Sequence, residues 1–293
     1  MKTLIIKLGA LGDVVRTTVL LRELPGKIYW LTKKNAADLL HSTKITQHFF
    51  IENSSDIRKL GKMQFDLILS LDEERATLKI LNGLKTKRRI GAFLDTKNKV
   101  DYTPEANILY RMSKISKLGK KKADLLKKQN GKTISEILFN MLGKKFGAQE
   151  YDLNTMPKAA KGTIGLINIS TGIWPNKYWY GYEKLRDLLK EDGYEVNFLG
   201  MRNTLKEHID DINNCAIIVC GDTLGMHIAL ALKKKVIALF NCTPPNEIYD
   251  YGRMVKIISP IWKKHFFSKT FSEEAIRAIP VSKVLQAVKQ TLI

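Results

Sequence analysis

The first twenty residues constrain the fold most strongly. An apolar run at 4–8 precedes Gly9 and Gly12, and residues 14–21 then have a helical period. This order predicts a strand, a tight loop and a helix. Glycines let a bound group approach the backbone, and the first turn of a helix offers unpaired N–H groups. The loop is therefore a candidate site for an anion or a reacting polar group, although Asp13 is also suited to cap the helix and nothing more.

Strand and helix patterns alternate along the rest of the chain. Strands are predicted at residues 27–31, 47–51, 65–71, 88–93, 163–169, 194–199, 216–219 and 236–240. Helices are predicted at residues 36–41, 73–84, 133–146, 182–190, 203–212, 224–232 and 280–292. Such alternation is typical of parallel sheets covered by helices on both faces.

A segment of low periodicity, residues 151–162, divides this alternation and contains both a proline and a glycine. The pattern predicts an α/β protein with two Rossmann-like doubly wound domains, 1–155 and 162–293, whose strands end at a common cleft. The last helix, 280–292, is assigned to the second domain and is also a candidate to pack back on the first.

Charge is unbalanced, with 49 basic and 29 acidic residues and a net charge of +20. This excess favours anionic partners, although a lysine-rich proteome gives the same number. Residues 113–132 contain eight lysines and one acid, Asp124. This segment is interpreted either as a patch for an anionic acceptor or lipid headgroups, or as a solvated helix surface. Nucleic acid is a weaker candidate, because no aromatic residues interleave with these lysines.

The three cysteines form no C-x-x-C motif and cannot all pair, which predicts a reduced, intracellular protein. Cys215 and Cys220 lie in a buried-strand pattern and are expected to be core thiols. No apolar stretch approaches the ~20 residues of a membrane span. We therefore expect a cytoplasmic protein with at most peripheral membrane contact.

Two further loops follow predicted strands and carry polar side chains. After the strand at 163–169 come Thr171, Gly172 and Lys177, whose side chains and backbone could bind a phosphate. The alternative is that the tryptophans of this loop only pack in the core and that Lys177 is a surface lysine. After the strand at 216–219 come Asp222, Thr223, Gly225 and His227. These residues also have a purely structural interpretation: Asp222 and Thr223 could simply cap the start of a helix, and a lone histidine such as His227 is often structural.

Together the three loops resemble glycosyltransferase family 9, the heptosyltransferases of lipopolysaccharide core synthesis, which have the two-domain GT-B fold. The matching residues are Gly9, Gly12 and Asp13 for G-x-x-G-D, Lys177 and Trp179 for K-x-W, and Asp222, Thr223, His227 and Ala229 for D-[ST]-x-x-x-H-x-A. The resemblance extends from residue 1 to about residue 260. Leu224 replaces a frequent glycine, Asn241-Cys242 replace Gly-Pro, and Glu207 is out of register with the family's ribose-binding glutamate.

The resemblance implies inverting, metal-independent transfer of a sugar, a heptose in this family, from a nucleotide-diphosphate sugar such as ADP-heptose. It implies no other cofactor, and it makes Asp13 the base that takes the proton of the attacking hydroxyl. The donor-binding residues that it implies are Thr171, Gly172, Lys177, Asp222, Thr223, Gly225 and His227. The implied acceptor is a lipopolysaccharide core or a similar anionic, lipid-linked glycan at the cytoplasmic face of the inner membrane.

Three alternatives belong to other classes. The first is a GT-B-shaped protein that binds nucleotide sugars without turnover. The second is a nucleotide-sugar epimerase, which the missing third glycine of G-x-G-x-x-G disfavours. The third is a nucleic-acid binder, whose affinity would fall steeply with salt.

Overall fold

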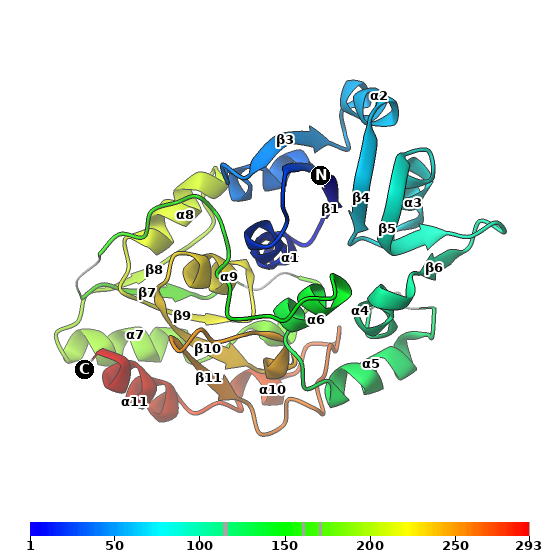
Figure 1. Cartoon of the computed structure of the whole chain (residues 1–293). Coiled ribbons are helices and arrows are strands. Elements are labelled where there is room, and N and C mark those ends of the chain that lie inside the picture. Colours follow the sequence, from blue (N-terminus) through cyan, green and yellow to red (C-terminus); the bar gives the residue numbers. More distant parts are fainter. Residues whose placement is uncertain (114–116, 160–161, 170–171, 293) are drawn as a thin grey trace. The chain divides into compact units, whose positions relative to one another are not determined.

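The computed structural model describes residues 1–113, 117–159, 162–169 and 172–292. Its internal contacts divide the chain into two compact units, Met1–Asn154 and Thr155–Ile293. Each unit has a sheet and helices of its own (Figure 1). Within the described residues no helix is both long enough and apolar enough to cross a membrane.

The sheet of the first unit has the order β3-β2-β1-β4-β5-β6. Its strands are β1 (Lys2–Ile6), β2 (Lys27–Thr32), β3 (Ile45–Phe50), β4 (Gln64–Ser70), β5 (Lys85–Leu94) and β6 (Val100–Tyr102). All neighbours pair in parallel except β6, which is antiparallel to β5. The chain moves outward from β1 on one side and from β4 on the other, so the strand order reverses between these two strands. Ligands of such sheets bind at the carboxyl ends of the strands at this position.

The helices of the first unit either connect these strands or follow the last of them. They are α1 (Leu11–Thr17), α2 (Ser54–Lys62), α3 (Arg75–Asn82), α4 (Asn107–Arg111), α5 (Lys120–Gln129) and α6 (Ile134–Met141). Shorter 3-10 turns are η1 (Thr18–Arg22), η2 (Lys34–Leu39) and η3 (Pro104–Ala106). The predicted helix at 36–41 is therefore one of these turns, and α2 was not predicted. α6 begins at a capping box formed by Thr133 and Glu136.

The second unit has a fully parallel sheet in the order β11-β10-β9-β7-β8. Its strands are β7 (Ile164–Ile167), β8 (Val196–Phe198), β9 (Ile217–Gly221), β10 (Lys235–Phe240) and β11 (Met254–Ile258). Its helices and 3-10 turns are η4 (Pro175–Lys177), α7 (Tyr182–Glu191), α8 (Leu205–Asn213), α9 (Leu224–Ala231), η5 (Pro245–Glu247), α10 (Glu273–Arg277) and α11 (Val281–Leu292). Here the strand order reverses between β7 and β9.

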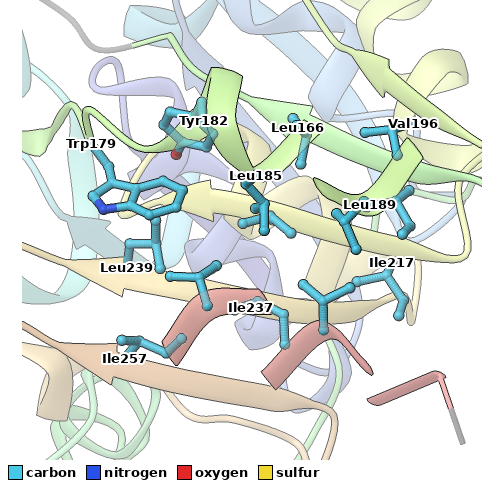
Figure 2. Close-up of a cluster of buried hydrophobic side chains, with 14 of the residues drawn as sticks. Leu166, Trp179, Tyr182, Leu185, Leu189, Val196, Ile217, Ile237, Leu239 and Ile257 are labelled. Atoms are coloured by element: carbon cyan, nitrogen blue, oxygen red, sulfur yellow. The ribbon is translucent and has the colours of Figure 1, made fainter. Parts of the chain in front are cut away.

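One core of the second unit lies between its sheet and the helices α7 and α11 (Figure 2). Trp179 is fully buried there, and its indole N–H donates to the carbonyl of Ile279 at 2.9 Å. The last helix, a candidate for packing on the first domain, contributes Val284 and Val288 to this core of its own unit. All three cysteines are buried and free, so the prediction of core thiols for Cys215 and Cys220 is confirmed.

We predict that Gly91→Ala destabilises the first unit by more than about 2 kcal/mol. Gly91 has φ +127°, and a Cβ there would lie 2.0 Å from the carbonyl oxygen of Ser70 on β4, so the strands would have to separate. Gly61→Ala is the control, because a Cβ at Gly61 meets no atom within 4 Å and alanine is the better helix former. Urea unfolding followed by circular dichroism measures both variants. Equal stability of the two would contradict the close approach of β5 to β4.

Candidate active site

Asp13 lies at the carboxyl end of β1, on the first turn of α1. The N-cap of this helix is Ala10, so the interpretation of Asp13 as the cap is wrong. Cationic groups approach both carboxylate oxygens: Arg16 Nη2 lies 2.8 Å from Oδ1, and Lys7 Nζ lies 3.9 Å from Oδ2. Positive charge close to a carboxylate favours its ionised form. A Cβ at Gly9 would meet no atom within 4 Å, so packing does not require this glycine.

Lys7 links the loop after β1 to the loop after β4. Its ammonium donates to Asp72 Oδ1 at 2.6 Å and to the carbonyl of Leu71 at 3.4 Å. Asp72 Oδ2 also accepts a hydrogen bond from the backbone N–H of Leu8. Burial raises the pKa of Asp72, and the Lys7 ammonium opposes this rise. Asp72 thus fixes both Lys7 and the beginning of the loop that leads to Asp13.

Glu73 is a second carboxyl group at this edge of the sheet. The hydroxyl of Tyr102 donates to Glu73 Oε2 at 2.6 Å, and the Tyr102 ring stacks on Tyr110 with centroids 4.6 Å apart. Burial raises the pKa of Glu73 to about 7, although the Tyr102 hydrogen bond and the nearby Lys7 lower it. Burial and Glu73 also raise the pKa of Tyr102. Glu73 therefore changes its charge near neutral pH, whereas most carboxyl groups are then fully ionised.

Sequence reasoning singled out Asp13 and missed its charged neighbours Lys7, Arg16, Asp72 and Glu73. A signal for the two acids was available, because they come directly after the apolar run at 65–71 that predicts a strand. Adjacent parallel strands end at the same edge of a sheet. Polar residues after both strands are therefore candidates for a common cluster.

In the second unit, the structure brings together Lys177, Asp222 and His227. The Lys177 ammonium donates to the carbonyl of Asp222 at 2.6 Å and to its Oδ2 at 3.2 Å. His227, which is buried on α9, has Nε2 3.9 Å from Asp222 Oδ1. Three of the predicted donor-binding residues thus form one contact group at the carboxyl end of β9.

The remaining residues that were predicted to bind the donor have different surroundings. Thr223 occupies the N-cap position of α9 without a side-chain cap, and its buried hydroxyl has no hydrogen-bond partner among the described residues. A Cβ at Gly225 would lie 2.3 Å from Ile167 Cδ1, so this glycine lets α9 approach β7 closely. A Cβ at Gly172 would meet no atom within 4 Å. Thr171 lies outside the described residues.

Two departures from the family pattern have a structural explanation. Asn241, directly after β10, donates from Nδ2 to the carbonyl of Tyr178 at 2.7 Å, so it fixes the segment that carries Lys177. Glu207 forms a capping box with Thr204 at the beginning of α8, because each residue's backbone N–H donates to the other's side chain. Glu207 is thereby engaged in the helix start.

Part of the lysine-rich segment forms α5. Lys120 is paired with Asp124 on this helix, and Lys117 is paired with Asp101. Ala123 is the buried residue of the helix. These contacts are typical of a solvated helix surface. A role for the segment in binding anions stays a prediction.

No group of three or more His, Cys, Asp or Glu side chains that could hold a metal ion occurs in the part of the chain that the structure describes.

The family model described as glycosyltransferase family 9 (heptosyltransferase) matches residues 201–277. The resemblance to family 9 is confirmed. Lipooligosaccharide heptosyltransferase 2 of Haemophilus influenzae is 36% identical over 81 residues, which span 26% of this chain and 23% of that relative. The match thus covers about a quarter of the family 9 relative.

Solved structures match over almost the whole chain. E. coli heptosyltransferase WaaC with ADP-2-deoxy-2-fluoro heptose has a TM-score of 0.65 at 15% identity and covers 99% of both chains. A family 9 glycosyltransferase from Veillonella parvula has a TM-score of 0.68 at 14% identity, covering 99% of this chain and 97% of that one. The predicted fold class, α/β of the GT-B type with two parallel-sheet units, is confirmed.

We predict that Glu73 lowers stability as the pH rises from about 4.5 to about 7. Its carboxyl group has a pKa of about 7 in the folded chain and an ordinary value of 4.5, so between these values the folded state holds the proton that the unfolded state has lost. Deprotonation above pH 7 completes the loss. We therefore compare the unfolding free energy of Glu73→Gln with that of wild type at pH 4.5 and at pH 7.5. Allowing for partial exposure, the difference should shift in favour of the variant by about 1 to 2 kcal/mol between these two pH values.

Chemical denaturation at several pH values measures this difference. Glu74→Gln is the control, because the neighbouring Glu74 is exposed. A difference between wild type and Glu73→Gln that stays constant with pH would contradict the assignment.

Proposed function

We propose that this chain is an inverting, metal-independent glycosyltransferase that moves a heptose from an ADP-sugar to a lipopolysaccharide core or a similar anionic glycan. The observation that carries the proposal is the family match at residues 201–277, because it includes the contact partners Asp222 and His227. The similar E. coli WaaC structure contains ADP-2-deoxy-2-fluoro heptose, which supports ADP-heptose as the donor for this chain.

Asp13 acts as the general base of this reaction. A sugar hydroxyl is a weak nucleophile, so a carboxylate must take its proton as the oxygen attacks the anomeric carbon. The new bond between this oxygen and the carbon forms while the bond from the carbon to the donor's diphosphate breaks. A single displacement of this kind inverts the configuration. Arg16 and Lys7 support the ionised form of Asp13 that the reaction needs.

Lys177 and the beginning of α9 stabilise the departing diphosphate. The Lys177 side chain is only 17% exposed and its ammonium is paired with Asp222, so the positive charge lies in a partly buried position. We propose that the Lys177 ammonium leaves Asp222 and binds the diphosphate. The hydroxyl groups of Thr171 and Thr223 and the first N–H groups of α9, near Gly225, bind the diphosphate as well. His227 contacts the diphosphate or the sugar. Gly172 leaves room for the donor.

Positive charge is the feature of this chain that bears on the acceptor. The net charge of +20 suits an anionic glycan or a lipid-linked acceptor, and the lysine-rich residues 117–132 suit peripheral contact with the cytoplasmic face of the inner membrane. The proposal requires Asp13 of the first unit and Lys177 of the second to serve one reaction.

We predict that Asp13→Asn and Asp13→Ala lower ADP release from ADP-heptose at least ~100-fold and leave the affinity for ADP unchanged. Asp38→Asn is the matched control, because Asp38 lies in the same unit with a similar exposure, 38% against 36% for Asp13. Turnover is measured with a core oligosaccharide or water as acceptor. Full activity of both Asp13 variants would remove Asp13 as the base. ADP binding by a wild-type chain that never releases ADP from ADP-heptose would favour a silent nucleotide-sugar binder.

We predict that Lys177→Met weakens ADP binding at least tenfold, because a partly buried ammonium that faces the diphosphate is lost. Lys184→Met, on the exposed face of α7, is the control. Isothermal titration calorimetry with ADP, UDP and GDP measures the affinities and identifies the preferred base. An unchanged affinity of Lys177→Met for the preferred nucleotide would contradict this role.

A further inference from the structure

Lys7 lies between two carboxylates and is bound to one of them. Its ammonium makes a direct contact of 2.6 Å with Asp72 Oδ1, whereas 3.9 Å separates it from Asp13 Oδ2. The second distance is too long for a hydrogen bond, although it still permits electrostatic attraction. A shift of about 1 Å would therefore turn the attraction between Lys7 and Asp13 into a direct ion pair.

Asp72 is firmly fixed. Its side chain is only 13% exposed, and its second oxygen accepts the backbone N–H of Leu8. Lys7 also donates to the carbonyl of Leu71, so the loop after β4 holds the ammonium at two points. The position of Lys7 is thus set by the loop after β4 and not by Asp13.

The surrounding charges identify the oxygen of Asp13 that this position affects. Arg16, on α1 like Asp13, approaches Oδ1, while Lys7, directly after β1, faces Oδ2. From the loop after β4, Asp72 contacts Lys7 directly, and Glu73 is a nearby carboxyl group that keeps its proton up to a pKa of about 7. Lys7 would therefore compete for Oδ2 with the proton of an acceptor hydroxyl if it were released from Asp72.

We propose that Asp72 is a positioning residue: it retains the Lys7 ammonium and thereby keeps it from pairing directly with Asp13 Oδ2, the oxygen that accepts the proton of the attacking hydroxyl. The inference rests on the proposed role of Asp13 as base. Lys7 at its observed distance favours the ionised carboxylate, whereas Lys7 in direct contact would occupy the reacting oxygen. Asp72 and Lys7 consequently have opposite effects on the base.

The test compares Asp72→Asn, Lys7→Met and the double variant by their pH–rate profiles for ADP release from ADP-heptose, with core oligosaccharide or water as acceptor. Asparagine at position 72 still accepts the Leu8 N–H, which preserves the loop. In Asp72→Asn we expect the rate at pH 7 to fall at least tenfold and the acidic limb to move down by about one pH unit, because Lys7 pairs with Asp13. In Lys7→Met the acidic limb should move up by a similar amount.

The double variant decides between positioning and a merely structural role. If Asp72 acts by retaining Lys7, removing Lys7 restores most of the rate lost in Asp72→Asn, and the profile resembles that of Lys7→Met. A double variant at least as slow as Asp72→Asn, or a shift of the acidic limb in the same direction for both single variants, would overturn the proposal.

A second measurement does not depend on activity. With ¹³C-labelled aspartate, the carboxyl resonance of Asp13, assigned by its loss in Asp13→Asn, should titrate at lower pH in Asp72→Asn and at higher pH in Lys7→Met. Unchanged titration in both variants overturns the inference even if the enzyme is active. An enzyme that loses no activity in Asp13→Asn but shows these shifts would instead disprove the proposed function and leave the charge arrangement standing.

Discussion

The parallel pairing of β1 with β4 is the constraint on which the charged cluster around Asp13 depends. In this register Ile6 faces Ser70, and the N–H of Leu71 donates to the carbonyl of Ile6 at 2.9 Å. The residues that leave the two strands therefore emerge side by side, and Lys7 meets Asp72 although 65 positions separate them in the chain. A slip of one residue would turn each side chain of β4 to the other face of the sheet and separate this pair.

The second unit uses the same principle with a different strand order. Ile167 of β7 faces Cys220 of β9, so the loops after both strands begin at one level. Gly221 then lets the backbone of the Lys177 segment come close, because a Cβ there would lie 2.9 Å from the carbonyl oxygen of Lys177. Asp222 neutralises the Lys177 ammonium, since an unpaired charge in this partly buried position would be costly. The proposed diphosphate would therefore compete with this carboxylate for the Lys177 ammonium.

Apolar runs predicted most strands, because strands buried on both faces are almost continuously hydrophobic. Two elements that escaped prediction lack this signal. The helix at 54–62 has only Ile57 and Leu60 as apolar anchors, and the strand at 254–258 has only Met254 and Ile257 buried. The spacing of the motifs identified Asp13, Asp222 and His227 as candidate site residues. It could not predict the ion pairs around them, since these depend on the register between strands far apart in the sequence.

The different roles of two carboxyl groups at the first edge follow from their different surroundings. Asp13 lies between Arg16 and Lys7 with its side chain 36% exposed, so both the cations and water favour its charged form. Glu73 is partly buried and is bound by a neutral hydroxyl, that of Tyr102, and burial raises its pKa to about 7. Where the environment separates two carboxyl groups in this way, the more readily ionised one is the better assigned base and the other is suited to hydrogen-bond donation. This contrast within a single sheet edge supports the proposed assignment of proton abstraction to Asp13 and not to its acidic neighbour.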